Sequence, residues 1–414
     1  MTPERIPVRL YSEIGRLNAV LLHTPGPEIE AMTPETAHDA LYSDILNLNI
    51  VNNEYRYFRG VFDKCTRTYQ VIDVLSEILS DPKIAEELVR KSCQVDGCDF
   101  LVDELLSHTP ATLAEELVNG FRYRAGKDPQ QFEASRYILK PLYNLFFTRD
   151  AASCVHDRVL INTMSFQVRK RESLIYRAIF NNFFHTNTFC AQDANPDART
   201  EGGDVQIVRD DLLCVGCGIR TNKAGIEYLM QANSHKPKFS IIAQELPLAP
   251  DSFIHLDMVF TFLGPHTCMA YEPLIRKSGI FAGKATTLIT CENGETTSRE
   301  FPNILEALKS QGVDLEPVYC GGAWIQQREQ WHSGANFFAL GENHIIGYRR
   351  NTHTIDALDH AGFHILNAED VVEHDINPFD FDKCVVTFAG SELPRGGGGA
   401  RCMTCPINRD ATVY

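Results

Sequence analysis

Short apolar runs that stop at polar or turn-forming residues recur along the chain, and they predict buried strands. The run Ala19–His23 ends at the turn Thr24–Pro27, which is the pattern of a strand that leads into a tight loop. Similar runs predict strands at Gln70–Leu75, Val159–Thr163, Gln206–Val208, Leu212–Val215, Ser240–Leu246, Val259–Leu263, Asn336–Leu340 and Ile345–Tyr348.

Helices are expected between these strands, where the apolar residues recur at helical spacing. The expected helices are residues 52–64, Arg171–Phe184, Ala224–Ala232, Asn303–Ser310 and Thr352–Ala361. Gly312 and Gly362 follow the last two as C-terminal stops. Strands that alternate with helices, together with several hairpins, predict an α/β fold that is not a simple doubly wound parallel sheet.

The pattern changes to purely helical between about residues 81 and 120. Asp81 and Thr109 each precede a proline at the first position of a helix, and Gly120 fits the end of the second helix. We therefore expect a helical insertion at 81–120, flanked by two parts of one catalytic domain, residues 1–80 and 121–414.

The composition is that of a globular protein with a sizeable core, because 44% of the 414 residues are hydrophobic and 22% are charged. A formal net charge of −15 argues against nucleic acid as a partner and is compatible with a cationic small substrate. No apolar run approaches the ~18 residues that cross a bilayer, and the N-terminus lacks the apolar region of a signal peptide. We expect no membrane partner.

The cysteines indicate a reducing compartment. There are 13 of them, an odd number without regular spacing, which favours free thiols over a disulfide framework. We therefore expect the protein to be cytoplasmic. We also expect it to form a homo-oligomer, of a size that the sequence does not specify.

The most unusual segment is the glycine run Gly396–Gly399, which is followed by Arg401 and Cys402. Such a run either flexes or lets the backbone approach another group closely. A cysteine beside an arginine fits a nucleophile, because a neighbouring cation lowers the pKa of a thiol. The alternative is a disordered linker beside a buried structural cysteine.

Other segments place polar residues where an apolar core would not favour them. Asn144–Asp150 ends in a charged pair, which could form an internal Arg149–Asp150 salt bridge. Glu201–Asp204 places two carboxylates around two glycines, and it could be only a turn.

His255 and Asp257 stand just before an apolar run, and the alternation of a strand edge would place both on one face. A lone histidine is more often structural, but a carboxylate beside it favours acid–base chemistry. Arg169 and Arg220 could each be an ordinary solvated surface charge.

Two Cys-x-x-Cys pairs, Cys214–Cys217 and Cys402–Cys405, suggest a competing interpretation as a four-thiolate zinc site or a redox centre. The pairs lie far apart in the sequence. Cys214 falls in a predicted strand, where side chains at i and i+3 point to opposite faces. Spacing alone supports the zinc site.

Taken together, these segments resemble the arginine deiminases of the guanidino-group-modifying superfamily. The matching segments, in the order of the family, are Tyr11–Gly15, Asn144–Asp150, Glu201–Asp204, His255–Asp257 and Gly396–Pro406. Each short motif is a weak signal by itself, whereas the ordered set is strong. The resemblance implies a pentein fold, a five-bladed α/β propeller around a central site, which composition and periodicity do not show.

The resemblance also implies roles for individual residues. Cys402 would be the nucleophile and His255 the general acid and base, while Asp150 and Asp257 would clamp a guanidinium group. Glu201 matches a further acidic residue near the histidine. The expected substrate-binding residues beyond this clamp are Asn144, Arg169, Arg220 and Arg401, and no metal or organic cofactor is needed.

The implied reaction is hydrolysis of free L-arginine to L-citrulline and ammonia through a covalent amidino-cysteine. Within the same fold, the alternatives are an agmatine deiminase, which would not need Arg169 and Arg220 for a carboxylate, and an amidinotransferase, which would need a second amine site. Outside the enzyme class, the alternative is the zinc or redox protein that the cysteine pairs suggest.

Overall fold

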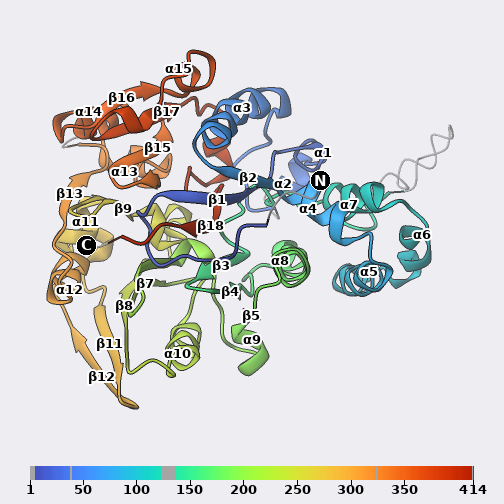
Figure 1. Ribbon diagram of the computed structural model, residues 1–414, viewed down its shortest axis with the longest axis horizontal. Coiled ribbons are helices and arrows are strands. Elements are labelled where there is room, and N and C mark those ends of the chain that lie inside the picture. The colour runs from blue at the N-terminus through green and yellow to red at the C-terminus, as the bar shows by residue number, and fades with distance from the viewer. Residues whose placement is uncertain (1–4, 38–39, 123–136, 323–324, 413) are drawn as a thin grey trace.

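The strands form several small sheets rather than one continuous sheet (Figure 1). The computed structural model describes residues 5–37, 40–122, 137–322, 325–412 and 414. Within these residues there are five sheets of three to five strands, and each contains both parallel and antiparallel neighbours. The predicted α/β class without a doubly wound parallel sheet is confirmed.

One sheet joins the two ends of the chain. Strand β1 (Leu17–Leu22) lies between its parallel neighbour β2 (Arg67–Gln70) and its antiparallel neighbour β18 (Cys405–Arg409). The register pairs Leu21 with Cys405. Strand β18 therefore anchors the end of the glycine-rich segment against the N-terminal strand.

The other four sheets follow along the chain. One contains β3 (Ala152–Val155), β4 (Arg158–Ile161) and β5 (Thr188–Phe189). The largest contains β6 (Val205–Arg209), β7 (Leu212–Cys217), β8 (Lys238–Glu245), β11 (Thr286–Glu292) and β12 (Glu295–Glu300). A third contains β9 (Phe260–Gly264), β10 (Thr267–Ala270) and β13 (Glu316–Tyr319), and the last contains β14 (Phe338–Gly341), β15 (His344–Tyr348), β16 (His364–Asn367) and β17 (Cys384–Phe388).

A buried polar residue stands a few positions before one strand of every sheet. These residues are Asp150 before β3, Asp204 before β6, Asp257 before β9, Asn336 before β14 and Cys402 before β18. Each strand thus fixes the backbone of one short polar segment. Segments that are far apart in the sequence are held in this way around one centre.

Helices connect and cover the strands (Figure 1). Outside the 81–120 region they are α1 (Pro27–Glu30), α2 (Pro34–Ala37), α3 (Leu48–Cys65), α4 (Val71–Ile78), α8 (Lys170–Asn182), α9 (Ala191–Ala194), α10 (Lys223–Ala232), α11 (Glu272–Arg276), α12 (Ile304–Ser310), α13 (Gln326–Trp331), α14 (Thr352–His360) and α15 (Ala368–Glu373). The predicted helices are confirmed with shifted ends. Helix α3 begins at Leu48, before the expected residue 52, because the Asn47 side chain accepts a hydrogen bond from the Ile50 N–H at 3.2 Å.

The predicted strand Gln70–Leu75 is wrong. Strand β2 ends at Gln70, and α4 follows it immediately. Val71, Val74, Leu75 and Ile78 are buried at i, i+3, i+4 and i+7, which is the spacing of one helix face. The β-branched side chains of Val71, Ile72 and Val74 favour a strand locally, but packing of the helix face overrides that preference.

The 81–120 region is helical as predicted. It contains α5 (Pro82–Asp96), α6 (Val102–Leu106) and α7 (Pro110–Asn119), and Asp81 and Thr109 cap their helices through side-chain oxygens. Helix α5 packs on α8, and α7 packs on α4, at one end of the molecule (Figure 1).

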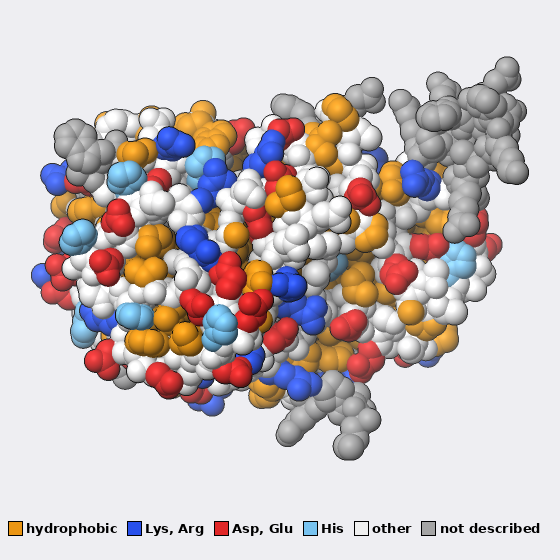
Figure 2. Space-filling view, turned by 90° about the horizontal axis from the view of Figure 1, so that it is seen from above, with side chains coloured by type: hydrophobic (Ala, Val, Ile, Leu, Met, Phe, Trp, Pro, Cys, Tyr) orange, Lys and Arg blue, Asp and Glu red, His pale blue; other side chains and the backbone are white. Residues whose placement is uncertain are grey.

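Among the described residues, no helix is long and apolar enough to cross a membrane. Figure 2 shows one face of the molecule, on which Lys and Arg side chains are interspersed with Asp and Glu. Among the side chains coloured there, no continuous basic tract covers the face.

Candidate active site

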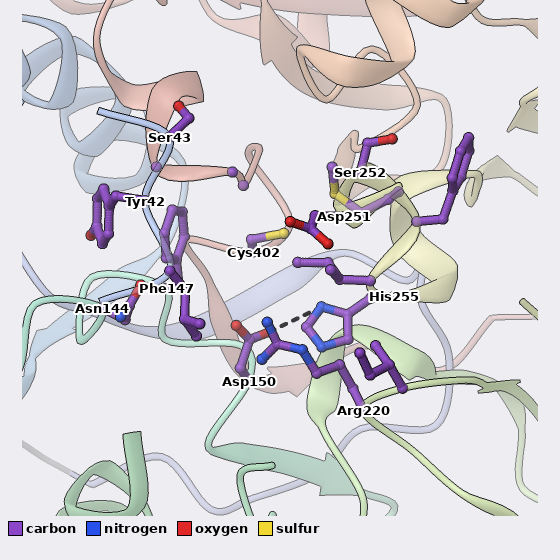
Figure 3. A pocket seen from close by; sticks show the side chains of 18 of the residues that line it. Tyr42, Ser43, Asn144, Phe147, Asp150, Arg220, Asp251, Ser252, His255 and Cys402 are labelled. Atoms are coloured by element: carbon purple, nitrogen blue, oxygen red, sulfur yellow. Dashed lines mark ion pairs between the residues drawn. The ribbon is translucent and has the colours of Figure 1, made fainter. Parts of the chain in front are cut away.

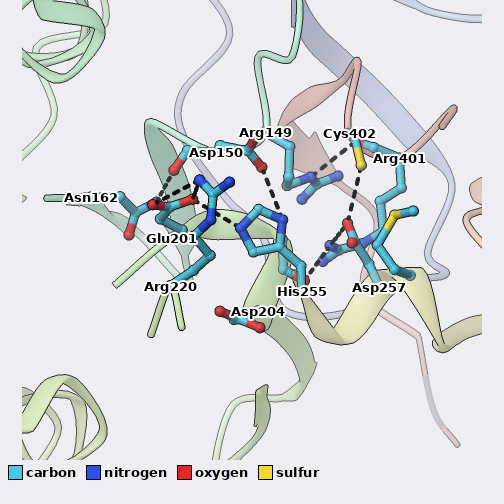
Figure 4. Close-up of polar contacts among 12 residues, drawn as sticks. Arg149, Asp150, Asn162, Glu201, Asp204, Arg220, His255, Asp257, Arg401 and Cys402 are labelled. Carbon is cyan, nitrogen blue, oxygen red and sulfur yellow. Dashed lines mark hydrogen bonds and ion pairs between the residues drawn. The ribbon is translucent and has the colours of Figure 1, made fainter. Parts of the chain in front are cut away.

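A cavity of about 350 Å³ lies where several of the polar segments meet (Figure 3). Of the residues predicted from the sequence, its lining includes Asn144, Asp150, Arg169, Arg220, His255 and Cys402. Glu201, Asp257 and Arg401 are fully buried around the same centre and contact these residues (Figure 4). The structure therefore brings all the predicted site residues together.

Cys402 is buried at the base of the cavity, with 3% of its surface exposed. Its Sγ lies 3.8 Å from Oδ2 of Asp257. Burial, together with the carboxylates of Asp257 and Asp150, raises the pKa of the Cys402 thiol well above its ordinary value. Without a ligand, the sulfur therefore holds its proton at neutral pH.

The glycine run lets the backbone approach buried side chains closely. A Cβ on Gly398 would lie 2.4 Å from Cε1 of Phe147, and one on Gly399 would lie 2.6 Å from Oδ1 of Asn336. Gly397 also has a φ of +85°, which favours glycine. Of the two explanations for the run, close approach accounts for these positions, and the loop lines the cavity as far as Gly398.

His255 lies between two carboxylates. Its Nε2 is 2.9 Å from Oε2 of Glu201, and its Nδ1 is 3.8 Å from Oδ1 of Asp150. Burial alone would lower the pKa of His255, but the charge of Asp150 and the hydrogen bond to Glu201 outweigh it and raise the pKa to about 9. The ring is therefore an imidazolium at neutral pH.

The expected strand edge at His255 and Asp257 is wrong. His255 precedes a short 3₁₀ helix, Leu256–Met258, which comes before β9. The Leu256 N–H donates to Oδ1 of Asp204 at 2.9 Å. This turn, rather than strand alternation, sets the directions of His255 and Asp257.

The glycines of the Glu201–Asp204 segment do more than form a turn. A Cβ on Gly203 would lie 2.4 Å from Nδ1 of His255, and one on Gly202 would lie 2.0 Å from the backbone oxygen of Arg149. The glycines thus leave room for the imidazole ring and for the neighbouring chain. Burial raises the pKa of the Asp204 carboxyl, beneath the ring, to about 6.

Asp150 and Asp257 each keep one oxygen without a hydrogen bond, although Oδ1 of Asp150 also faces Nδ1 of His255 at 3.8 Å. Oδ2 of Asp150 accepts from Arg169 at 2.6 Å, and Oδ2 of Asp257 accepts from Arg401 at 2.9 Å. In both residues Oδ1 is buried without a hydrogen-bond partner among the described residues. Buried carboxylate oxygens are costly unless they are paired, so this pair is suited to a cation that enters the cavity.

Arg169 and Arg220 are buried, with 4% and 5% of their surfaces exposed, so neither is a solvated surface charge. Arg169 is held by both oxygens of Glu172 as well as by Asp150. Arg220 donates to Oε2 of Glu201 at 3.1 Å. Its Nε has no partner within the described part of the chain, which leaves Arg220 better able to take a further anion.

Arg401, like Asp257, does not line the cavity. Its guanidinium donates to both oxygens of Glu13, at 3.1 Å each, and to Asp257. It therefore lies beneath the carboxylate rather than beside a ligand. The Arg149–Asp150 salt bridge considered from the sequence is absent among the described residues, and Arg149 donates instead to the backbone oxygen of Arg401.

Sequence reasoning assigned no role to Glu13 or Asn336. Arg401 and Arg149 hold the pKa of the Glu13 carboxyl at about 2 against the effect of burial. The matching segment Tyr11–Gly15 was a usable signal for Glu13. Asn336 contacts the Cys402 sulfur at 3.2 Å. The only sign of this role in the sequence was that Asn336 is a polar residue directly before a buried apolar run.

The two Cys-x-x-Cys pairs do not form a metal centre. In the part of the chain that the structure describes, which includes all four cysteines, no three His, Cys, Asp or Glu side chains are grouped so that they could hold a metal ion. Cys214 is fully buried in β7, and the Sγ of Cys405 donates to the Ala152 oxygen at 3.7 Å.

Solved structures with the same fold come from enzymes that act on guanidino groups. The N-terminal domain of ArgZ, a cyanobacterial arginine dihydrolase, is 12% identical, with a TM-score of 0.55 over 94% of this chain and 97% of that chain. An amidinotransferase from Microseira wollei is 14% identical, with a TM-score of 0.54 over 99% of both chains. For the dimethylarginine dimethylaminohydrolase of Pseudomonas aeruginosa the values are 12% and 0.51, over 94% and 99%. These likenesses show the class of fold, which is the pentein fold with mixed α/β sheets.

The sequence comparisons narrow this class to one family. The model of the arginine deiminase family matches residues 38–409. The arginine deiminase of Limosilactobacillus reuteri is 30% identical over 98% of both chains, and that of Listeria innocua is 30% identical over 97% of this chain and 98% of the relative. The chain belongs to the arginine deiminase family.

Proposed function

We propose that this protein is a hydrolase of the C–N bond in a linear amidine, and that it converts free L-arginine to L-citrulline and ammonia through a covalent amidino-cysteine. One observation carries the proposal. Two buried carboxylate oxygens close to the Cys402 thiol, Oδ1 of Asp150 and Oδ1 of Asp257, accept no hydrogen bond from the described residues. A planar guanidinium, with several N–H donors in a fixed plane, matches two such acceptors.

Binding of the substrate would also activate the nucleophile. The pKa of the Cys402 thiol is raised by burial and by the same carboxylates that would clamp the guanidinium. A cation bound there cancels their effect and favours the thiolate. The proton leaves for the solvent, and the thiolate attacks the central carbon of the held guanidinium.

His255 supplies the proton for the leaving group. Because its pKa is raised to about 9, it enters the reaction as imidazolium. It protonates the departing nitrogen, which leaves as ammonia, and the carbon stays bonded to the sulfur as a positively charged amidino thioether. The neutral imidazole then takes a proton from water, and the hydroxide adds to the carbon. As the carbon–sulfur bond breaks, the added hydroxyl gives its proton to the departing sulfur, and citrulline and the Cys402 thiol are released. These steps need no metal or organic cofactor.

Two charged residues act as positioning residues. Glu201 orients His255, and its own charge is secured because Arg220 and His255 outweigh burial and hold the pKa of its carboxyl far below the ordinary value. Arg401 fixes Asp257 from below and is itself held by Glu13. We therefore assign Arg401 an indirect part in substrate binding.

Part of the cavity wall carries positive charge, whereas the clamp carries negative charge. This positive part supports a substrate that has a carboxylate. Asn144, Arg169 and Arg220 line the cavity, and Arg220 has an unpaired buried Nε among the described residues. Agmatine has no carboxylate to offer these groups. An amidinotransferase would require a binding place for a second amine, for which we assign no residues.

The architecture supports three further proposals. Residues 81–120 are a helical insertion, and residues 1–80 and 121–414 are the catalytic domain. The five sheets, each with a polar residue just before one strand, are the blades of a five-bladed propeller around the site. We also propose that the protein is a cytoplasmic homo-oligomer. Light scattering of the purified protein tests the oligomeric state.

The function is tested by incubating the protein separately with L-arginine, agmatine and a peptide containing arginine. Citrulline and ammonia should form in equal amounts from L-arginine, and neither of the other compounds should be a good substrate. Equal turnover of agmatine would replace the proposed substrate, and transfer of the amidino group to an added amine would replace the proposed reaction.

A further inference from the structure

We propose that Asn336 is a further catalytic residue, which stabilises the Cys402 thiolate by donating a hydrogen bond from its side-chain amide to the sulfur. The proposal rests on the proposed role of Cys402 as nucleophile. The Asn336 side chain is buried, with 1% of its surface exposed, and its Nδ2 lies 3.2 Å from Sγ of Cys402.

The orientation of the Asn336 amide follows from its surroundings. Oδ1 lies 2.9 Å from the backbone nitrogen of Arg401 and 3.3 Å from that of Cys402. Both backbone N–H groups are donors, so the atom that faces them must be the oxygen. The other end, which faces the sulfur, is therefore the NH₂ group.

The same amide connects the nucleophile to the guanidinium clamp. Nδ2 also lies 3.1 Å from the backbone oxygen of Asp257 and 3.7 Å from Sδ of Met258. Its two shortest contacts, with this oxygen and with the Cys402 sulfur, can each take one of its two hydrogens. The close approach explains a glycine as well, because a Cβ on Gly399 would lie 2.6 Å from Oδ1 of Asn336. A side chain at position 399 would push the amide away from the sulfur.

A neutral donor suits this place better than a cation would. The charged groups that act on the Cys402 thiol are Asp257 and Asp150, which oppose ionisation, and Arg401, which favours it. Arg401 is already paired with Glu13 and Asp257. A second cation beside the sulfur would repel the incoming guanidinium, whereas an amide N–H stabilises the thiolate without adding charge.

The position of Asn336 in the fold is that of the other site residues. It precedes β14 as Asp150 precedes β3 and Asp257 precedes β9. The sheet that begins with β14 thus contributes a group at the place where the other sheets contribute theirs. The backbone there is fixed by the strand, so the amide is presented in a constant position.

The test is the pH dependence of Cys402 alkylation by iodoacetamide, followed by mass spectrometry of the peptide that contains the residue. In Asn336→Ala the midpoint should rise by about one pH unit or more, because a hydrogen bond to a charged group is lost. Asn336→Leu keeps the volume of the side chain and removes the donor without adding a charge, and its midpoint should also rise. It decides the matter if the alanine variant does not fold.

The matched control is Asn233→Ala. Asn233 is also fully buried, and its amide donates to the Leu229 oxygen at 2.8 Å, so it reports the effect of losing a buried amide elsewhere. Its alkylation midpoint should stay at the wild-type value. An unchanged midpoint in the folded Asn336 variants, or an equal rise in the control, overturns the proposal. Alkylation requires no arginine turnover, so this result is independent of the substrate assignment.

Discussion

Nε2 of His255 lies 2.9 Å from Oε2 of Glu201, and both side chains are almost completely buried. The glutamate therefore works together with Asp150 to keep the imidazole protonated, with a pKa of about 9. A protonated histidine is what the departure of ammonia requires. The pair connects the Glu-Gly-Gly-Asp segment directly to the chemistry.

The first prediction concerns the pH profile of Glu201→Gln. The proton of His255 is present below its pKa, so wild-type kcat/KM, which reports the ligand-free protein, should fall as the pH rises through about 9. Loss of the carboxylate lowers that pKa, and the alkaline limb should move down by about one unit or more. Steady-state rates measured from about pH 6 to about pH 10, in half-unit steps, give the shift of the alkaline limb. A limb that stays in place would remove Glu201 from its proposed role.

The second prediction separates the two cysteines of the C-terminal pair. Cys402→Ser should abolish turnover with the fold intact, because a hydroxyl does not ionise near neutral pH as a thiol can. Cys405→Ser should keep most of the activity, since the Cys405 Sγ only donates to the Ala152 oxygen in the core. Circular dichroism and arginine turnover of both variants are the measurements. Comparable losses in the two would favour a paired-cysteine function.

The third prediction concerns the guanidinium clamp. Asp150→Asn and Asp257→Asn should each lower kcat/KM for arginine by about a hundredfold or more, because each removes a charge-assisted bond in a buried site. The matched control is Asp193→Asn, on the exposed helix α9, where the carboxylate pairs with the partly exposed Arg177 at 3.3 Å. That variant should stay within about twofold of the wild type. Normal kinetics for either site variant would exclude that residue from the clamp.

The fourth prediction concerns substrate choice. Arg220→Ala should reduce kcat/KM for arginine by about a hundredfold, and it should reduce any residual agmatine turnover much less, because only arginine loses a partner for its carboxylate. Arg220 also pairs with Glu201, but that effect is common to both substrates and cancels in their ratio. The arginine-to-agmatine ratio is therefore the measurement. A ratio equal to that of the wild type contradicts the carboxylate assignment.

The local sequence was enough to predict most of the residues that take part in the chemistry, but not how their side chains are oriented. Cys402, His255 and Asp150 stand in short motifs whose residue types indicate nucleophilic and acid–base work. The direction of His255 could not be predicted, because it depends on a 3₁₀ turn that Asp204 holds through the Leu256 N–H. Asp204 and Leu256 are far apart in the sequence.

The same limit explains the errors in the fold and the missed residues. Val71, Ile72 and Val74 favour a strand by type, and only burial on one side shows that this segment forms helix α4. Glu13 and Asn336 matter because the packing of segments that are distant in the sequence brings them to Arg401 and Cys402. No local pattern at either residue shows that contact.

The central claim is that arginine is hydrolysed through a covalent bond to Cys402. Rapid quenching of the reaction tests this claim most directly. Wild-type protein mixed with excess L-arginine should be stopped in acid within the first turnovers and analysed by peptide mass spectrometry. The account predicts an added mass of arginine less ammonia on the peptide that carries Cys402, with citrulline and ammonia accumulating together. Turnover of arginine with no adduct on Cys402, or an adduct on another residue, would contradict it.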